Sequence, residues 1–349
     1  MFIYYLNIFL VFMSYFVIYN SKIKNKKLCF CFWIFIQLTL IMGLRWGIGT
    51  DYFSYKSHYS KIIQEGIFYS EFEPGFNLLN LFSHKIGMEF QGVIILSSII
   101  SVGCVAYAVY HCSDSPCLSI ILYLTFGFYY AAMNQIRAYI AVSISLAGIN
   151  FLIKQKKIKY IISILLASFF HVTALCMLPF LLVIRLRWRT RQFIISVFLA
   201  ITSLFFVDTV IQFGIKLYPK YGNYIGSVYD KGYGIQSLCL VILGLILILA
   251  YRKQLLKWNK NTIIFENFAL YGFLIGLFQL KLMMMDRFVA YFTAPVYILG
   301  LPLITKCYTE KKKKILVSLV LFFLGILYCT FILIRNWNGV VPYRMFFGI

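Results

Sequence analysis

The sequence has few charged residues, and very few of them are acidic. Only 13% of its 349 residues are charged, whereas a soluble domain has about 25%. Hydrophobic residues make up 62% of the chain. A core cannot bury that much apolar surface, which excludes a soluble protein. Unbroken apolar runs, in place of the alternation typical of a β-barrel, predict an all-α, polytopic membrane protein.

The chain also lacks the short motifs of several enzyme classes. It contains no GxSxG, no HExxH and no P-loop, which argues against lipase-type, zinc-protease and ATPase chemistry. Its acidic residues show no pattern typical of a metal cage, so we expect neither a metal nor a cofactor. Most of the nine cysteines lie in or beside apolar runs, where we interpret them as small hydrophobic residues.

Basic residues outnumber acidic ones by 33 to 11, which gives a formal net charge of +22. They gather in short clusters between apolar runs, which predicts contact with anionic lipid headgroups and no nucleic-acid partner. If both termini face outward, the main clusters all lie on one side of the membrane. The positive-inside rule makes that side cytoplasmic. The clusters are at 22–27, 154–159, 185–191, 252–260 and 306–314.

A bilayer is crossed by about 20 apolar residues, and the sequence predicts about twelve transmembrane helices in one membrane domain, residues 1–349. Two larger outer loops, about 45–92 and 209–234, carry most of the acidic residues. This topology requires two short helices within 157–184, with His171 at their turn. It also requires 76–88 to lie on the membrane surface without crossing it. The predicted spans are 2–19, 28–44, 93–110, 117–132, 135–153, 157–170, 173–184, 191–208, 235–251, 262–280, 287–304 and 315–333.

Two polar motifs lie in the first outer loop. In the first, glycines separate Arg45 from Asp51 and Tyr52. Glycine permits close approach of a ligand, and a guanidinium suits phosphate oxygens, but an interfacial Arg45–Asp51 pair is the plain alternative. The second motif places Glu73 before Pro74 and Gly75. Glu73 either caps the following helix or is held against a bound sugar.

Three further motifs lie at the outer ends of predicted helices. Asn134, Gln135 and Arg137 occur within one helical turn, where they either form interhelical hydrogen bonds or face a wet cavity. His171 has apolar neighbours and is either a structural histidine or a proton acceptor. Asp286 and Arg287 begin a late span; as sequence neighbours on a helix they diverge and do not pair. The last two motifs are ASFFHVTA and MMMDR.

Taken in order, these motifs resemble those of the EpsG-like branch of the Wzy polysaccharide polymerases. The matching patterns are RxGxGTDYxxY, EPGF, MNQxRxxIA, AxxxHxTA and a late DR. They cover about 40–300. The chain departs from the expected pattern at Ala138, where a glutamine is expected.

The resemblance implies an enzyme of the inner membrane of a Gram-negative bacterium, with a GT-C-like architecture and an active site facing the periplasm. Its substrates would be oligosaccharide units linked to undecaprenyl pyrophosphate. It would move the growing chain from its lipid carrier to the non-reducing end of a new unit, as in O-antigen synthesis. A co-polymerase that sets chain length is the protein partner that the resemblance implies.

Such a reaction needs groups that stabilise the leaving pyrophosphate and a base for the acceptor hydroxyl. We expect Arg45, Arg137 and Arg287 to bind the pyrophosphate. His171, Glu73 and Asp51 are candidate bases, and His171 is favoured because an imidazole exchanges protons near neutral pH. Residues expected to contact the substrate are Tyr52, Asn134, Gln135 and Asp286.

Three rival functions come from other classes: a flippase for the lipid-linked unit, an O-antigen ligase and a non-catalytic assembly subunit. A flippase should carry charges through both halves of the membrane, often with internal repeats. This sequence has its acidic residues mainly on one face and no repeat. A ligase shares the donor and differs in the acceptor, so only the family resemblance separates it.

Overall fold

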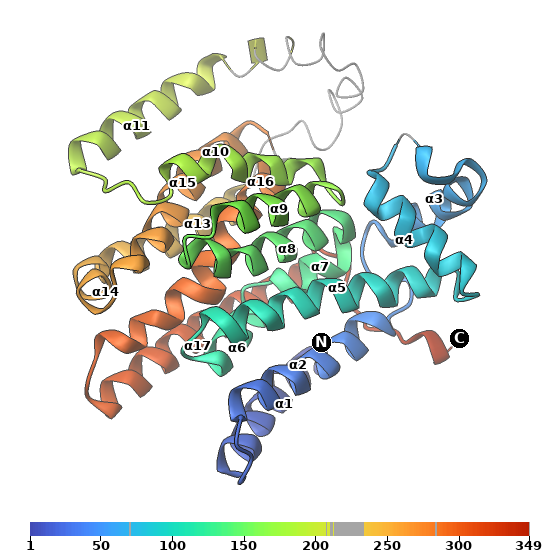
Figure 1. Ribbon diagram of the computed structural model, residues 1–349, viewed down its shortest axis with the longest axis horizontal. Helices are drawn as coiled ribbons and strands as arrows, with labels where there is room; N and C mark the ends of the chain where they lie inside the picture. Colours follow the sequence, from blue (N-terminus) through green and yellow to red (C-terminus); the bar gives the residue numbers. More distant parts are fainter. Residues whose placement is uncertain (70, 207, 210–211, 213–233, 283–284, 349) are drawn as a thin grey trace. The chain divides into compact units, whose positions relative to one another are not determined.

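Apolar α-helices account for most of the chain (Figure 1). The computed structural model describes residues 1–349 except 70, 207, 210–211, 213–233, 283–284 and 349. Within that part of the chain there is no β-strand, and the one bridge outside the helices joins Arg45 to Met345. The all-α prediction is therefore confirmed for the described residues. The second large outer loop, 209–234, falls almost entirely outside them.

The helices in the first half of the chain are α1 (Phe2–Asn20), α2 (Lys26–Gly43), α3 (Tyr52–Glu65), η1 (Gly66–Phe68), α4 (Pro74–Lys85), α5 (Glu89–Cys112), α6 (Pro116–Thr125), α7 (Phe128–Asn134), α8 (Ile136–Ile153), α9 (Lys157–Ser168), η2 (Val172–Cys176) and α10 (Met177–Val183). Those that follow are α11 (Thr190–Ser203), η3 (Leu204–Phe206), α13 (Ile235–Ala250), α14 (Arg252–Trp258), η5 (Lys260–Thr262), α15 (Ile263–Gly276), η6 (Leu277–Leu280), α16 (Asp286–Pro295), η8 (Val296–Gly300), η9 (Leu301–Cys307), α17 (Lys311–Arg335) and η10 (Phe346–Gly348).

Seven helical segments among the described residues are long and apolar enough to cross a membrane, and nine if each of two bent pairs counts as one span. The bent pairs are α6 with α7 and α13 with α14. These nine match nine of the twelve predicted spans. The other three, at 157–170, 173–184 and 191–208, stay predictions because their helices are shorter than a full span.

The chain divides into two compact units. The first comprises Met1–Leu175 with Tyr297–Ile349, and the second comprises Cys176–Val296. In the first unit α5 packs against α2 and α8, while α9 packs on α8 and α17 packs on α6. In the second unit α15 packs against α13 and α16. A single membrane domain stays a prediction.

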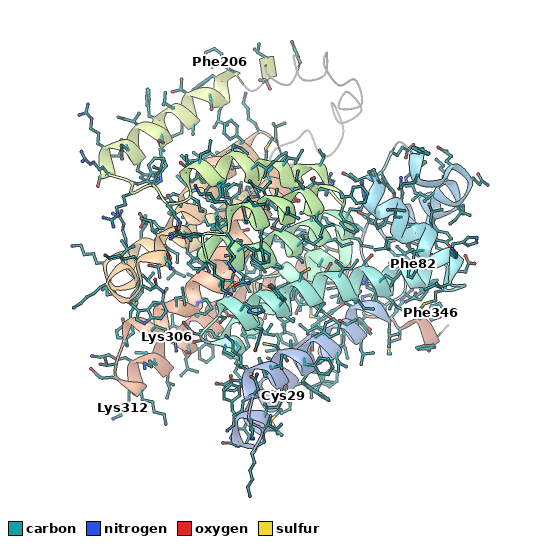
Figure 2. All side chains as sticks on the ribbon, in the orientation of Figure 1. Cys29, Phe82, Phe206, Lys306, Lys312 and Phe346 are labelled. Atoms are coloured by element: carbon teal, nitrogen blue, oxygen red, sulfur yellow. The ribbon has the colours of Figure 1, made fainter. Side chains whose placement is uncertain are left out.

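The two ends of the first unit differ in character. Figure 2 shows Cys29, Lys306 and Lys312 towards one end and Phe82 and Phe346 towards the other. The ammonium group of Lys27 lies 5.7 Å from the ring of Tyr110, near the last turn of α5. Two of the predicted cytoplasmic clusters, at 22–27 and 306–314, therefore lie at the end away from α4 and the C-terminal tail. That this end faces the cytoplasm stays a prediction.

The first outer loop contains two helices, α3 and α4, which lie together beside the start of α5 (Figure 1). With 12 residues, α4 is too short to cross a bilayer. It corresponds to the surface helix predicted over 76–88, and its position on the membrane surface stays a prediction. Leu78 and Phe82 in this helix and Ile86 directly after it are exposed, which suits a helix that lies in the membrane interface.

The C-terminal tail returns to the loop that follows α2. The backbone N–H of Trp46 donates to the carbonyl of Arg344 at 3.0 Å, and that of Gly49 donates to Gly339 at 3.0 Å. The hydroxyl of Tyr343 donates to the carbonyl of Ile41 at 2.8 Å. The tail thus holds the Gly-rich loop in place.

Gly49 tests how tightly this loop is packed. Its φ of +106° disfavours any L side chain, and an added Cβ would lie 2.9 Å from the carbonyl oxygen of Met133. We expect Gly49→Ala to lower the free energy of unfolding by about 2–4 kcal/mol, because backbone strain and a steric clash add. SDS titration in mixed micelles measures the loss.

Gly87→Ala is the matched control. Gly87 also has a positive φ, of +73°, but a Cβ there meets no atom within 4 Å. We expect a loss of only about 1 kcal/mol from the backbone term. Equal losses for the two variants would contradict the close approach at Gly49.

Candidate functional site

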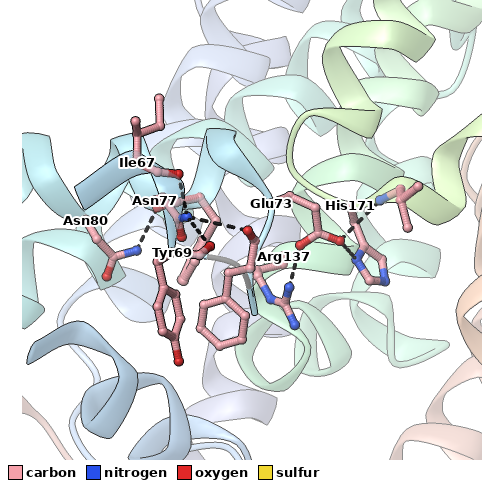
Figure 3. Close-up of polar contacts among 10 residues, drawn as sticks. Ile67, Tyr69, Glu73, Asn77, Asn80, Arg137 and His171 are labelled. Atoms are coloured by element: carbon pink, nitrogen blue, oxygen red, sulfur yellow. Dashed lines mark hydrogen bonds and ion pairs between the residues drawn. The ribbon is translucent and has the colours of Figure 1, made fainter. Parts of the chain in front are cut away.

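The carboxylate of Glu73 joins three segments of the first unit (Figure 3). Its Oε1 lies 2.8 Å from Nδ1 of His171 and accepts the backbone N–H of Val172 at 3.3 Å. Its Oε2 accepts a hydrogen bond from Nη1 of Arg137. Glu73 thus joins two residues that are each more than 60 positions away along the chain. The three form one cluster, Glu73–Arg137–His171, which we call the acid–base cluster.

Local sequence explains how Glu73 reaches its partners. Pro74 occupies the first turn of α4, where its fixed φ suits a helix start and Glu73 is the extended N-cap residue. The Glu73 side chain does not cap its own helix, so it is available to the cluster. The N–H of Gly75 donates to the carbonyl of Phe169 at 2.8 Å, and a Cβ on Gly75 would lie 2.6 Å from that oxygen. A glycine here lets α4 approach the turn that carries His171.

Charge stabilises Glu73 against its burial. The side chains of Glu73 and Arg137 are each 17% exposed. Burial alone would raise the Glu73 pKa, but the hydrogen bond from His171 and the charge of Arg137 outweigh it and lower the pKa to about 2. Glu73 is therefore an anion at neutral pH.

An ionised Glu73 fixes the protonation of His171. Because a carboxylate only accepts hydrogen bonds, the ring nitrogen that faces it, Nδ1, carries the proton. The other nitrogen, Nε2, is buried and has no hydrogen-bond partner among the described residues. When the ring is neutral, its lone pair is therefore on Nε2.

Arg137 lies in the first turn of α8. Its guanidinium carbon lies 3.9 Å from the centre of the Phe72 ring and 6.0 Å from that of Tyr55. Stacking on an aromatic face holds the plane of the guanidinium. The fork carries five N–H donors, so donors remain beyond the one that binds Glu73.

Arg45, also expected to bind the pyrophosphate, lies in a different environment. It is 1% exposed, and its guanidinium donates to the carbonyls of Met42 and Met133, the latter at 3.0 Å. Ser98 Oγ lies 3.5 Å from Nη1. A buried guanidinium that binds backbone carbonyls favours a structural role, and the expected contact of Arg45 with the pyrophosphate stays a prediction.

Asp51 and Asn134 meet beside Arg45. The amide oxygen of Asn134 accepts the hydroxyl of Thr50 at 2.9 Å and the backbone N–H of Asp51 at 3.0 Å. Asn134 is 6% exposed, and this contact uses it to tie the loop to α7. The expected roles of Asp51 as a base and of Asn134 in substrate binding stay predictions.

The remaining residues of the predicted site are Tyr52, Gln135, Asp286 and Arg287. Tyr52 is buried, and its ring packs edge-on against Phe90 with centres 5.3 Å apart. Gln135 lies at the break between α7 and α8. Asp286 and Arg287 begin α16 in the second unit, so their convergence with the acid–base cluster stays a prediction.

A family model described as the EpsG family matches residues 28–345, which is nearly the whole chain. The chain belongs to the EpsG family. This membership indicates a membrane protein of the polysaccharide-polymerase type. No curated protein and no solved structure matches the chain.

In this EpsG-family protein, sequence reasoning missed two residues that support the acid–base cluster. Phe72 covers Arg137, and the buried side chain of Asn77 donates to the carbonyls of Ile67 and Tyr69 at 3.0 and 2.9 Å. Asn77 thereby holds the loop that ends at Phe72 and Glu73. The available signals were an aromatic residue directly before the EPGF motif and a polar residue within α4.

The lowered pKa of Glu73 predicts a pH dependence of the EpsG-family protein's stability. A carboxyl whose pKa falls on folding stabilises the fold above its unfolded pKa of about 4.5. That contribution, on the order of 3 kcal/mol, is lost as the pH falls from about 4.5 towards 2. The stability difference between the wild type and Glu73→Gln should therefore be constant above pH 5 and shrink below it.

Unfolding midpoints of both proteins in detergent, measured from pH 3 to 7, test this expectation. A difference that stays constant down to pH 3 would show that Glu73 has no lowered pKa.

Proposed function

We propose that this protein polymerises oligosaccharide repeat units carried on undecaprenyl pyrophosphate, at the periplasmic face of a Gram-negative inner membrane. The growing chain moves from its lipid carrier to the non-reducing end of a new unit, which produces O-antigen or a related surface polysaccharide. The observation that carries the proposal is the single carboxylate, Glu73, that binds both a histidine and an arginine. This arrangement supplies a base next to a cation, as glycosyl transfer from a pyrophosphate requires.

His171 is the proposed base. Its Nε2 accepts the proton of the acceptor hydroxyl while that oxygen forms a bond to the anomeric carbon. Glu73 holds Nδ1–H and stabilises the imidazolium that results, by the same logic that operates in a catalytic triad. Glu73 therefore orients His171 and does not bind the sugar.

Arg137 is the proposed partner of the leaving group. The bond between the anomeric carbon and the pyrophosphate oxygen breaks, and the electron pair leaves with the diphosphate. A fixed guanidinium stabilises that growing charge without reorganisation. Arg287 is expected to add a second cation, and undecaprenyl pyrophosphate departs as the product.

The location of the acid–base cluster supports an extracytoplasmic reaction. Glu73 begins α4, and α4 lies at the end of the first unit away from the lysine clusters at 22–27 and 306–314 (Figure 2). By the positive-inside rule, those clusters lie on the cytoplasmic side. Membrane lipids surround the enzyme, both termini face the periplasm, and a chain-length co-polymerase is the proposed protein partner.

Substitutions in the acid–base cluster test the proposal in a strain that lacks the chromosomal gene. We expect His171→Ala and Glu73→Gln each to slow polymerisation by about a hundredfold or more, because the first removes the base and the second its anionic partner. A gel of the surface polysaccharide should then show lipid A core with a single unit and no ladder of longer chains.

His84→Ala is the matched control. His84 also lies in the first outer loop beside a glutamate, Glu89, but its side chain is 48% exposed and 3.5 Å from that partner. It should support a normal ladder. Bare core in the deletion strain would point to a flippase or a ligase, and a normal ladder from His171→Ala would refute the base assignment.

A further inference from the structure

Two arginines of the first unit, Arg45 and Arg137, occupy opposite kinds of environment. Arg137 binds a carboxylate, whereas Arg45 forms no ion pair with any described carboxylate, although it is 1% exposed. A buried charge without a counter-charge is costly. Something other than an acidic residue must therefore compensate for Arg45.

Two helix ends provide that compensation. Arg45 donates to the carbonyl of Met42, in the last turn of α2, and to the carbonyl of Met133, in the last turn of α7. The last carbonyls of a helix lack partners within the helix and form the negative end of its dipole. One planar guanidinium fork thus closes two helix termini.

Met133, whose carbonyl accepts a hydrogen bond from Arg45, lies four residues before Arg137. Between them are Asn134, which binds the Thr50–Asp51 loop, and the break from α7 to α8 at Gln135. The carbonyl oxygen of Met133 also lies 2.9 Å from where a Cβ of Gly49 would be. The contacts of Arg45 and of the loop that follows it therefore fix the start of α8, and with it the position of Arg137.

We infer that Arg45 is a positioning residue that caps α2 and α7 together and thereby sets where α8 presents Arg137, without touching substrate. The inference rests on the proposed function for the role of Arg137. The part that concerns the α7–α8 junction does not depend on that function. Burial lowers the pKa of Arg45 to about 10, so it remains a cation at neutral pH.

A double-mutant cycle tests the junction with the purified full-length protein in detergent. Thr50→Val removes the hydroxyl that binds Asn134, the residue next to Met133 in the same junction. If both residues act through that junction, Arg45→Gln combined with Thr50→Val should lower the thermal midpoint little more than Arg45→Gln alone. Additive losses would overturn the inference.

Thr330→Val serves as the matched control. The Thr330 hydroxyl lies 2.8 Å from that of Tyr5, where α17 meets α1. Its effect should add to that of Arg45→Gln, because the two sites share no partner. Arg45→Lys should recover more than half of the midpoint and of the ladder lost in Arg45→Gln, since a cation at the helix ends is retained. No recovery would count against the helix-end account.

Arginine labelling separates positioning from substrate contact. Phenylglyoxal followed by mass spectrometry should modify Arg137, and farnesyl pyrophosphate should protect it. Arg45 should stay unmodified with or without this probe. Modification of Arg45 that the probe prevents would overturn the inference. A coupled junction without protection of Arg137 would uphold the positioning role and refute the proposed pyrophosphate site.

Discussion

An anionic carboxylate held between a histidine and an arginine organises the end of the first unit that carries α4. Glu73 lies at the start of α4, His171 follows α9, and Arg137 opens α8. Each of these helix ends is thereby tied to the other two. Burial opposes a charge at this position, and the hydrogen-bonded imidazole and the guanidinium do most to stabilise it. The same contacts set the tautomer of His171. The three side chains that join the helix ends therefore also determine which nitrogen of the imidazole carries the proton.

A second set of contacts, those around Arg45, supports the acid–base cluster. The Gly-rich loop after α2, the junction of α7 with α8 and the C-terminal tail meet around Arg45. Their bonds are mostly to the backbone, which suits a membrane protein in which irregular segments must satisfy their own polar groups. The motif that begins at Arg45 therefore supports the end of the first unit that holds the acid–base cluster. In the proposed function, the motifs around Glu73, Arg137 and His171 supply the chemistry.

The long apolar helices were predictable because their signal is local. Helices such as α5 and α17 are long enough to cross a bilayer, and each contains an 18-residue apolar stretch with at most two charged residues. Two breaks were harder to anticipate: α6 ends where Gly127 adopts a φ of +85°, and α13 bends by 61° into α14. The sequence predicts spans at short helices such as α9 because an apolar composition does not show where a helix ends.

The site was predictable as a set of residue types and unpredictable as a geometry. Sequence placed Arg45 and Arg137 in one class because both lie beside glycines or amides at helix ends. Burial and hydrogen-bond partners distinguish them, and these depend on contacts that span 88 positions for Arg45 and 64 for Arg137. The pairing of the tail with the loop joins residues about 300 positions apart, and no periodicity or motif encodes such a contact.

Nitrogen-15 NMR of the histidine-labelled protein at neutral pH tests the central pairing most directly. The account predicts that Nδ1 of His171 carries a hydrogen-bonded proton in the wild type, and that this signal moves or disappears in Glu73→Gln. It should be unchanged in a variant of the exposed Glu89. A neutral His171 protonated at Nε2 in the wild type would contradict the account.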